Sequence, residues 1–243
     1  MPVLIYFGVL ILAAWLLYYS VVSPYFDVTD VSVSGARLLD AQQARNATGS
    51  LGRNVLLLRP EEIQESVRRL TVARDVRAVL ALPGRLDIQV TERTPLVQWQ
   101  AREGSFLVDR EGVFFSREAP LGPVAVVREL DGPAMEVGSR IDPSVLAAIE
   151  ILEVTLPQRA GVKPLWFDYS WSGGIASPTE GGARVIFGDA ADLDSKLATL
   201  VAVQEHLSAS KARAEIIDLR FKGRPTYVLA SPAPAKPSGQ ARQ

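Results

Sequence analysis

The sequence lacks cysteine altogether and contains one histidine, His206, among its 243 residues. Without cysteine the chain can form no disulfide, no thiolate metal site and no cysteine nucleophile. It also lacks an excess of basic residues, because 26 Lys and Arg residues are balanced by 27 Asp and Glu residues. Proteins that neutralise phosphates usually carry such an excess, so the composition argues against nucleic-acid binding.

Patterns that carry enzyme chemistry are also scarce. His206 falls in the middle of a predicted helix, off its apolar stripe, where a solvated side chain is expected rather than a member of a Ser-His-Asp triad. The glycines between residues 173 and 182 lack the spacing of a phosphate-binding loop and predict a hairpin connection. No histidines or carboxylates have a spacing typical of metal ligands. The sequence therefore predicts no enzyme, cofactor, metal or small-molecule substrate; the alternative is a membrane-tethered envelope hydrolase with an unrecognised carboxylate pair.

The segment from Val3 to Val22 contains no charged residue and is rich in Leu, Ile and Val. About 20 residues, at about 1.5 Å of rise each, match the roughly 30 Å hydrocarbon core of a bilayer. A cleaved signal peptide would have a basic start and a shorter apolar stretch, and a core helix would have a polar face. Residues 1–24 are therefore predicted to form a transmembrane anchor bounded by Val3 and Val22, with the chain from Asp27 onward outside the cytoplasm.

Residues 25–95 predict a small unit with the element order β-α-α-β-β. The expected segments are a strand ending at Gly35, a helix from Asp40 to Gly49, a helix beginning at Pro60, and strands over residues 72–82 and 86–90 joined by a Pro83-Gly84 turn. Asp40 is a helix-capping residue, Gly49 is a typical C-terminal stop, and Pro60 is favoured at a first helical position. Two amphipathic helices on one face of a three-stranded sheet would form a small core.

Residues 96–230 predict a β-rich unit. Short apolar runs separated by turn residues indicate strands over residues 96–100, 105–108, 113–116, 124–127, 165–169, 183–187, 216–221 and 225–230. Apolar stripes predict one helix beginning at Asp142-Pro143 and another over Asp192–Ser210. We expect an α+β fold with a curved antiparallel sheet and flanking helices. Residues 231–243 are rich in Pro, Ser and Ala and predict a disordered tail.

Three phrases in these units resemble the FtsQ/DivIB family of bacterial cell-division proteins. They are G-R-N-V-L-L-L-R-P-E-E-I at residues 52–63, an E-R-x-P-x-x-x-W pattern formed by Glu92, Arg93, Pro95 and Trp99, and I-D-L-R at residues 217–220. The family's frequent Pro-Trp and Trp-Pro pairs are replaced here by Thr71-Val72 and Leu82-Pro83, at positions expected only to pack the module. The resemblance implies a POTRA domain and an FtsQ-type β domain after a single anchor, with the boundary near Pro95.

The resemblance also implies a function. It is that of a non-enzymatic divisome scaffold in the cytoplasmic (inner) membrane, enriched at the division septum. Such a protein would recruit FtsB/DivIC-like and FtsL-like membrane proteins through extracytoplasmic protein–protein contacts. The rival interpretation is a POTRA-type chaperone or transport protein that escorts substrates to an outer-membrane barrel. The mixture of helices and strands after residue 96 is unlike the many alternating segments of a barrel.

The last predicted strand, Pro225–Ala230, is the predicted partner-binding site, because an exposed sheet edge can accept a partner strand through backbone hydrogen bonds. Tyr227 would be its aromatic anchor. The full set of predicted partner-binding residues is Tyr227, Val228, Leu229, Phe221 and Arg220. In the alternative interpretation Tyr227, Val228 and Leu229 fill the core, and strand alternation assigns at least Val228 to it. The partner would then bind the POTRA edge at Val72–Leu80.

Overall fold

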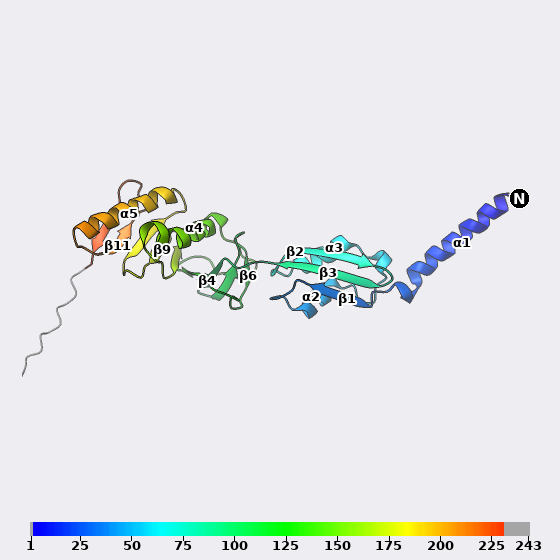
Figure 1. The fold of residues 1–243 in the computed structure, drawn as a ribbon. Coiled ribbons are helices and arrows are strands. Elements are labelled where there is room, and N and C mark those ends of the chain that lie inside the picture. Colours follow the sequence, from blue (N-terminus) through cyan, green and yellow to red (C-terminus); the bar gives the residue numbers. More distant parts are fainter. Residues whose placement is uncertain (1, 231–243) are drawn as a thin grey trace, which may run out of the picture. The chain divides into compact units, whose positions relative to one another are not determined.

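The computed structural model describes residues 2–230 and divides the chain into two compact units, Met1–Thr94 and Pro95–Gln243. Each unit has its own sheet (Figure 1). Each also has its own cluster of buried apolar side chains. The predicted tail at residues 231–243 lies outside the described residues. The α+β fold class predicted from the sequence is confirmed.

The first unit begins with α1, Pro2–Val22, a 21-residue helix with no acidic residue in its first turn and no basic residue in its last turn. None of the segment Ile5–Val22 is buried against other parts of the chain. The ring of Trp15 stacks on that of Tyr19, with 5.7 Å between their centroids. Among the described residues, α1 is the one helix that is long and apolar enough, by length and composition, to cross a membrane.

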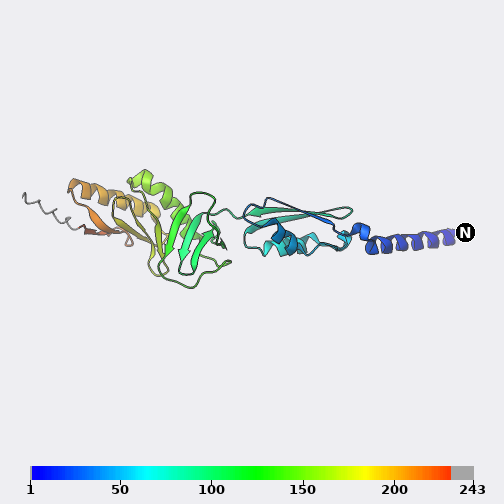
Figure 2. The ribbon, with the colours of Figure 1, turned by 90° about the horizontal axis from the view of Figure 1, so that it is seen from below.

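The remainder of the first unit is a small helix-and-sheet layer. Its elements are η1 (Pro24–Phe26), β1 (Asp30–Ser34), α2 (Ala41–Thr48), η2 (Val55–Leu57), α3 (Pro60–Arg68), β2 (Ala73–Ala81) and β3 (Arg85–Glu92). In the strand order β1-β3-β2, β1 runs parallel to β3 and β2 runs antiparallel to it. Both α-helices pack on one face of the sheet (Figure 2), where Ile63 and Val67 of α3 join Leu86 and Ile88 of β3 in the core. The predicted β-α-α-β-β order is confirmed.

Local sequence signals explain where the helices of this unit begin and end. The Asp40 carboxylate accepts a hydrogen bond from the N–H of Gln42 at 2.9 Å and caps α2. Gly49 ends α2 in a left-handed conformation with φ of 55°. Pro60 is the first residue of α3, and an acidic pair in the first turn lies near the positive end of the helix dipole.

The second unit is a nine-stranded sheet with two long helices. Its elements are β4 (Val97–Ala101), β5 (Gly104–Val108), β6 (Phe114–Ser116), β7 (Ala125–Glu129), α4 (Pro143–Ala160), β8 (Phe167–Ser170), β9 (Gly174–Pro178), β10 (Arg184–Gly188), α5 (Leu193–Ala209), β11 (Ala214–Asp218) and β12 (Thr226–Leu229). The strand order is β12-β11-β10-β9-β8-β7-β4-β5-β6. Helices α4 and α5 pack on one face of this sheet (Figures 1 and 2), over a core that includes Trp99, Phe106 and Phe114.

The prediction of an antiparallel sheet is wrong in this unit, because the sheet is mixed. The pairs β4–β7, β7–β8 and β10–β11 are parallel, and the other pairs are antiparallel. For the pairs β7–β8 and β10–β11 the reason is the position of the helices in the chain. Helix α4 connects β7 to β8 and α5 connects β10 to β11, and a helical crossover carries the chain back so that the next strand runs in the same direction.

One strand was also missed. Strand β9 lies at residues 174–178, inside the glycine-containing stretch for which the sequence predicted only a connection. Its sequence, G-I-A-S-P, has one large apolar residue and therefore no clear apolar period. The structure buries its centre nevertheless, with Ile175 1%, Ala176 7% and Ser177 0% exposed. Pairing on both sides, with β8 and β10, determines this strand rather than its own composition.

Candidate partner-binding edge

Strand β12 forms one end of the nine-stranded sheet and pairs with β11 alone among the described strands. The pairing is antiparallel, with Ile217 opposite Tyr227 and Asp218 opposite Thr226. The N–H of Ala230 donates to the carbonyl of Arg213 at 2.8 Å, which extends the ladder beyond the strand. Backbone groups alternate in direction along an antiparallel strand, so residues 226, 228 and 230 bond toward β11. The N–H and C=O groups of Tyr227 and Leu229 consequently point away from the sheet.

All four residues of β12 are exposed. The exposed fractions are 39% for Tyr227, 53% for Val228 and 53% for Leu229. The interpretation in which Val228 fills the core is therefore wrong, because about half of Val228 is exposed. Among the described strands, β12 is the last of the sheet and has a neighbouring strand on one side only. An edge strand with three exposed apolar side chains can extend the sheet with a strand from another molecule.

Tyr227 lies on the same side of the sheet as helix α5. Its ring centroid is 6.4 Å from that of His206 on α5, and the His206 side chain is exposed. The predicted solvated position of His206 is confirmed. Its proximity to Tyr227 could not be predicted from the sequence, because it depends on the strand order and on which face α5 covers.

The turn before β12 contains the other two predicted partner-binding residues. The Arg220 guanidinium donates to the Asp218 carboxylate, with Nη2 at 2.6 Å from Oδ2. This hydrogen bond with Arg220 is the main reason why the pKa of Asp218 is lowered, and the same bond raises the pKa of Arg220. Phe221 is 62% exposed, and the Arg220 guanidinium carbon lies 5.8 Å from the centre of its ring. Arg220 thus organises the turn before β12, in which Phe221 presents an exposed apolar side chain.

The opposite end of the sheet is closed. Strand β6 is buried throughout, and the N–H of Phe114 donates to the carbonyl of Ser139 at 3.0 Å. The N–H of Gly138 donates to the carbonyl of Phe114 at 2.7 Å, and that of Ile141 to the carbonyl of Gly112 at 2.9 Å. Residues 138–141 therefore occupy the outer side of this edge.

Two residues of the E-R-x-P-x-x-x-W pattern, Glu92 and Trp99, make structural contacts, each within its own unit. In the first unit the Glu92 carboxylate accepts hydrogen bonds from the N–H groups of Arg37, Leu38 and Leu39. In the second unit the Trp99 side chain is 0% exposed, and its Nε1 donates to Glu129 at 3.1 Å. Glu92 therefore orders a loop in the first unit, and Trp99 fills the core of the second.

The sequence D-R-E-G at residues 109–112 predicts a hairpin turn with solvated charges, and the structure corrects one of these charges. Asp109 is 4% exposed. Its Oδ1 accepts hydrogen bonds from the N–H groups of Glu111 and Val113 at 2.9 and 3.0 Å. A buried carboxylate is tolerated here because the turn supplies these donors. The hairpin turn itself is confirmed, since β5 and β6 pair antiparallel on either side of it.

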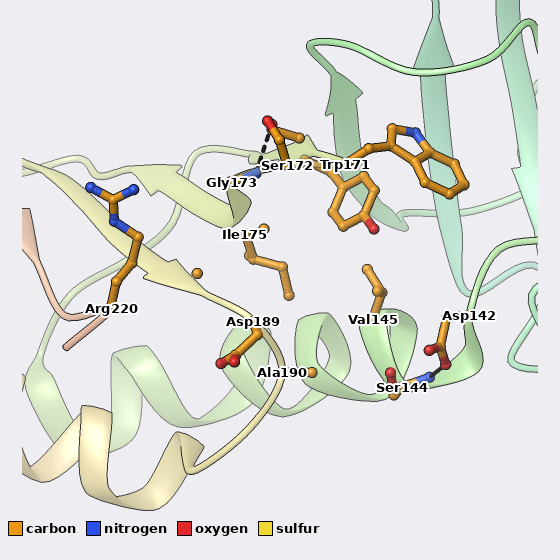
Figure 3. Close-up of a pocket in the computed structure, with 14 residues that line it drawn as sticks. Asp142, Ser144, Val145, Trp171, Ser172, Gly173, Ile175, Asp189, Ala190 and Arg220 are labelled. Atoms are coloured by element: carbon orange, nitrogen blue, oxygen red, sulfur yellow. Dashed lines mark hydrogen bonds between the residues drawn. The ribbon is translucent and has the colours of Figure 1, made fainter. Parts of the chain in front are cut away.

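A polar cavity of about 430 Å³ lies between the β8–β9 turn and the N-terminus of α4 (Figure 3). Its charged residues already have partners. Asp142 accepts the N–H of Ser144 at 2.8 Å, which lowers its pKa, and Asp189 pairs with Lys196 at 2.6 Å, which lowers its pKa as well. Within residues 2–230 no group of three or more His, Asp or Glu side chains could hold a metal ion. The two acidic residues that line the cavity therefore have structural roles, in which Asp142 caps a helix and Asp189 forms an ion pair.

The geometry therefore defines a class of protein, in which an apolar N-terminal helix precedes a POTRA-like unit and a β-rich unit with one open sheet edge. Comparison with family models agrees with this class. Residues 26–93 match the FtsQ-type POTRA domain, and residues 97–220 match the C-terminal region of the cell division protein FtsQ/DivIB. The chain belongs to the FtsQ/DivIB family of cell-division proteins.

Individual relatives support the same conclusion. The chain is 29% identical over 196 residues to the cell division protein FtsQ of Chloroflexus aggregans, covering 79% of this chain and 72% of the relative. It is 26% identical to FtsQ of Chloroflexus aurantiacus, covering 87% and 77% of the two chains. The identity to FtsQ of Myxococcus fulvus is 27%, with coverage of 92% and 81%. The family match ends at Arg220, so β12 lies outside the matched segment.

Proposed function

We propose that this chain is a non-enzymatic scaffold of the bacterial division machinery that binds a membrane protein partner by accepting one of its strands at β12. The observation that carries the proposal is the open edge of β12, where exposed apolar side chains lie beside outward-facing backbone groups. FtsB/DivIC-like and FtsL-like proteins are the proposed partners, because the chain belongs to the FtsQ/DivIB family. Backbone bonds would supply affinity, and Tyr227 would supply an aromatic anchor.

The edge of the first unit is a poorer acceptor than β12. Strand β2 lies at one end of its sheet and presents Arg74, Asp75 and Arg77, all exposed. Charged side chains on an edge strand discourage the addition of another strand. Strand β12, with the sequence T-Y-V-L, carries no charge. This difference favours β12 over the alternative site at Val72–Leu80.

In this proposal α1 crosses the cytoplasmic membrane once, and the chain from Asp27 onward lies outside the cytoplasm as a POTRA domain (residues 25–95) and a β domain (residues 96–230) enriched at the septum. The length and composition of α1 support the crossing. A C-terminal fusion to an enzyme that is active only after export should be active. A fusion to a reporter that works only in the cytoplasm should be inactive, and the reverse pattern would contradict this topology.

Two substitutions at Leu229 distinguish binding through the backbone of β12 from binding through its side chains. Leu229→Pro removes an N–H that points away from β11, whereas Leu229→Ala shortens the same side chain and keeps that N–H. We expect Leu229→Pro to weaken partner binding by roughly 10- to 100-fold, or about 1.4–2.8 kcal/mol, and Leu229→Ala to weaken it much less. The measurement is quantitative recovery of the FtsB/DivIC-like partner with the full-length variants, cross-linked in cells.

Thermal unfolding of the same variants distinguishes lost binding from lost structure. The N–H of Val228 bonds toward β11, so Val228→Pro should lower the melting temperature. Leu229→Pro should leave the melting temperature nearly unchanged, because edge strands tolerate proline where the N–H faces outward. If Leu229→Pro melts like the wild type and recovers as much partner as the wild type, binding by strand addition at β12 is wrong.

A further inference from the structure

One side chain in the loop between α2 and α3 forms hydrogen bonds with the last turn of α1. The Asn54 side-chain amide donates to the carbonyl oxygens of Ser20 and Val21, each at 2.9 Å. Carbonyls in the last turn of a helix have no partner within the helix, so Asn54 acts as a C-terminal cap supplied from a distant part of the sequence. Its Oδ1 meanwhile accepts the N–H of Leu56 at 2.9 Å and fixes the turn η2.

The turn between β2 and β3 is held against the same segment that leaves α1. The N–H of Thr29 donates to the carbonyl of Gly84 at 2.9 Å, and the N–H of Val28 donates to that of Arg53 at 2.9 Å. Gly84 has no room for a side chain, because a Cβ there would overlap the carbonyl oxygen of Asp27. Figure 1 shows this turn at the end of the sheet nearest to residues 24–28. The loop and the β-turn are thus both fixed beside the end of α1.

The length of α1 sets the depth of these segments once the helix spans a bilayer. Its 21 residues, at about 1.5 Å each, cover the roughly 30 Å hydrocarbon core, and the headgroup layer adds roughly 5–8 Å on each side. Asn54 bonds to the last turn of α1, so it lies at the level of the headgroups. Leu56 and Leu57 lie two and three residues after Asn54, and chain geometry allows at most about 3.8 Å between consecutive Cα atoms. These leucines therefore lie at or near headgroup depth.

The side chains at this level are apolar and exposed. The exposed fractions are 69% for Tyr25, 46% for Leu56, 59% for Leu57 and 67% for Leu82. We call these four residues the membrane-proximal surface. Tyrosine is enriched at bilayer interfaces. Arg53 and Arg59, both exposed, flank the leucines on either side in the sequence and suit the phosphates of anionic lipids.

We propose that the membrane-proximal surface binds the lipid headgroup layer of the same bilayer that α1 spans, so that the POTRA unit is docked on the membrane. The inference rests on the proposed membrane-spanning position of α1. The occupant is lipid, because the surface is continuous with the end of the anchor and its cap, Asn54, bonds directly to the last turn of that helix. The apolar side chains enter the interface, and the guanidinium groups bind lipid phosphates.

The absence of cysteine makes a direct depth measurement possible, since a single introduced cysteine can carry a spin label. The full-length chain would be reconstituted in bilayer discs of phosphatidylethanolamine and phosphatidylglycerol as Leu57→Cys, Leu82→Cys, Thr91→Cys or Leu12→Cys. Thr91 is the matched control, because it is exposed near the other end of the strand that follows Leu82. Leu12, in the middle of α1, is the reference for the hydrocarbon core. The readout is the collision rate with oxygen, which partitions into lipid, relative to that with a water-soluble nickel chelate.

We expect the ratio of oxygen to nickel collisions to be several-fold higher at positions 57 and 82 than at position 91, and highest at position 12. Equal ratios at 57, 82 and 91, with a lipid-like ratio at 12, would overturn the membrane-proximal surface and leave the anchor intact. A water-like ratio at 12 would overturn the anchor itself and this inference with it. Protection of 57 and 82 from both reagents would mean that protein covers the surface, which would also overturn the proposal. Circular dichroism and melting of each labelled variant establish that the fold is retained.

Discussion

At one end of the nine-stranded sheet β6 is buried under residues 138–141, which bond to its outer side, while at the other end β12 is exposed along its length. Both are short strands at the margin of the same sheet, with three and four residues. A free sheet edge promotes association with other chains, and proteins usually cover edges, shorten them or place charges on them. Within residues 2–230, one edge is covered by the chain itself and the other is apolar, uncharged and exposed.

The difference between the two edges supports the proposed binding of a partner at β12. Covering β6 requires a connection that passes along the strand and donates hydrogen bonds to it, and the chain provides one between β7 and α4. No described segment does the same for β12. The apolar composition of β12 would be a liability in an isolated protein but is expected where a partner strand completes the sheet. Substitutions that change one edge at a time can test this difference.

The largest expected effect follows from uncovering β6. Gly112 has a φ of 80°, and a Cβ there would overlap the carbonyl oxygen of Ile141. Gly112→Val should therefore push residues 138–141 away from β6 and lower the free energy of unfolding by on the order of 3 kcal/mol, through strain and lost contacts. Once uncovered, the edge should also promote self-association. Chemical denaturation and light scattering at increasing protein concentration measure the two effects.

The matched control for this change is Gly122→Val. Gly122 is exposed, and a Cβ at this position would meet nothing within 4 Å. The control should unfold within about 0.5 kcal/mol of the wild type and stay monodisperse. Self-association of both valine variants to the same degree would show that added apolar surface, and not the exposed edge, causes it.

The ends of the helices could be predicted from the sequence, because they depend on a few neighbouring residues. Capping residues and glycines placed the helix ends well: Asp142 caps α4 by accepting the N–H of Ser144, and Gly161 ends it with φ of 61°. The strands of the first unit were predictable from apolar alternation. Such signals are local, because a cap or a strand period depends on a few consecutive residues.

Features that depend on distant pairing could not be predicted. Strand β9 is defined by its neighbours, and the burial of Val228 was predicted wrongly because alternation alone cannot tell an edge strand from a central one. The closure of β6 by residues 138–141 and the cap on α1 from Asn54 likewise join segments that are far apart in the sequence. The sequence predicted a candidate site at the last strand, and the position of that strand at the end of the sheet follows from the strand order of the whole sheet.

A smaller effect is expected from the side chains of the open edge. Tyr227→Ala should weaken partner binding by about 1–3 kcal/mol, as for other aromatic anchors, and should change the melting temperature little because 39% of the side chain is exposed. Val228→Ala tests the other face of the strand, and we expect it to weaken binding by less than about 1 kcal/mol with a similarly small change in melting. Calorimetric affinity and thermal unfolding of both variants measure this. A Tyr227→Ala variant that binds normally but melts early would assign the tyrosine to packing beside His206 on α5.

The smallest expected effect concerns the Asp218–Arg220 pair, which fixes the turn before β12. Hydrogen bonding to Arg220 lowers the pKa of Asp218, so Arg220→Ala should raise that pKa toward the ordinary carboxyl value of about 3.9. The lowered pKa means that the pair stabilises the fold above the ordinary carboxyl pKa, and that this contribution is lost as pH falls through the lowered value. The Arg220 side chain is 44% exposed, so the stabilisation at neutral pH should be ~1 kcal/mol or less.

Carboxyl NMR titration of Asp218 and melting curves at neutral and acidic pH measure the effect of Arg220→Ala. Arg224→Ala is the control, because it removes an equal charge from an exposed position in the same turn. The melting temperatures of Arg220→Ala and the wild type should differ at neutral pH and converge in acid, while Arg224→Ala should leave the pKa of Asp218 low. Partner binding should change least in these variants, since the Arg220 guanidinium is already bonded to Asp218. Should Arg220→Ala abolish binding while Asp218 still titrates at its lowered pKa, Arg220 would contact the partner directly, and the open edge would extend beyond β12 into the turn.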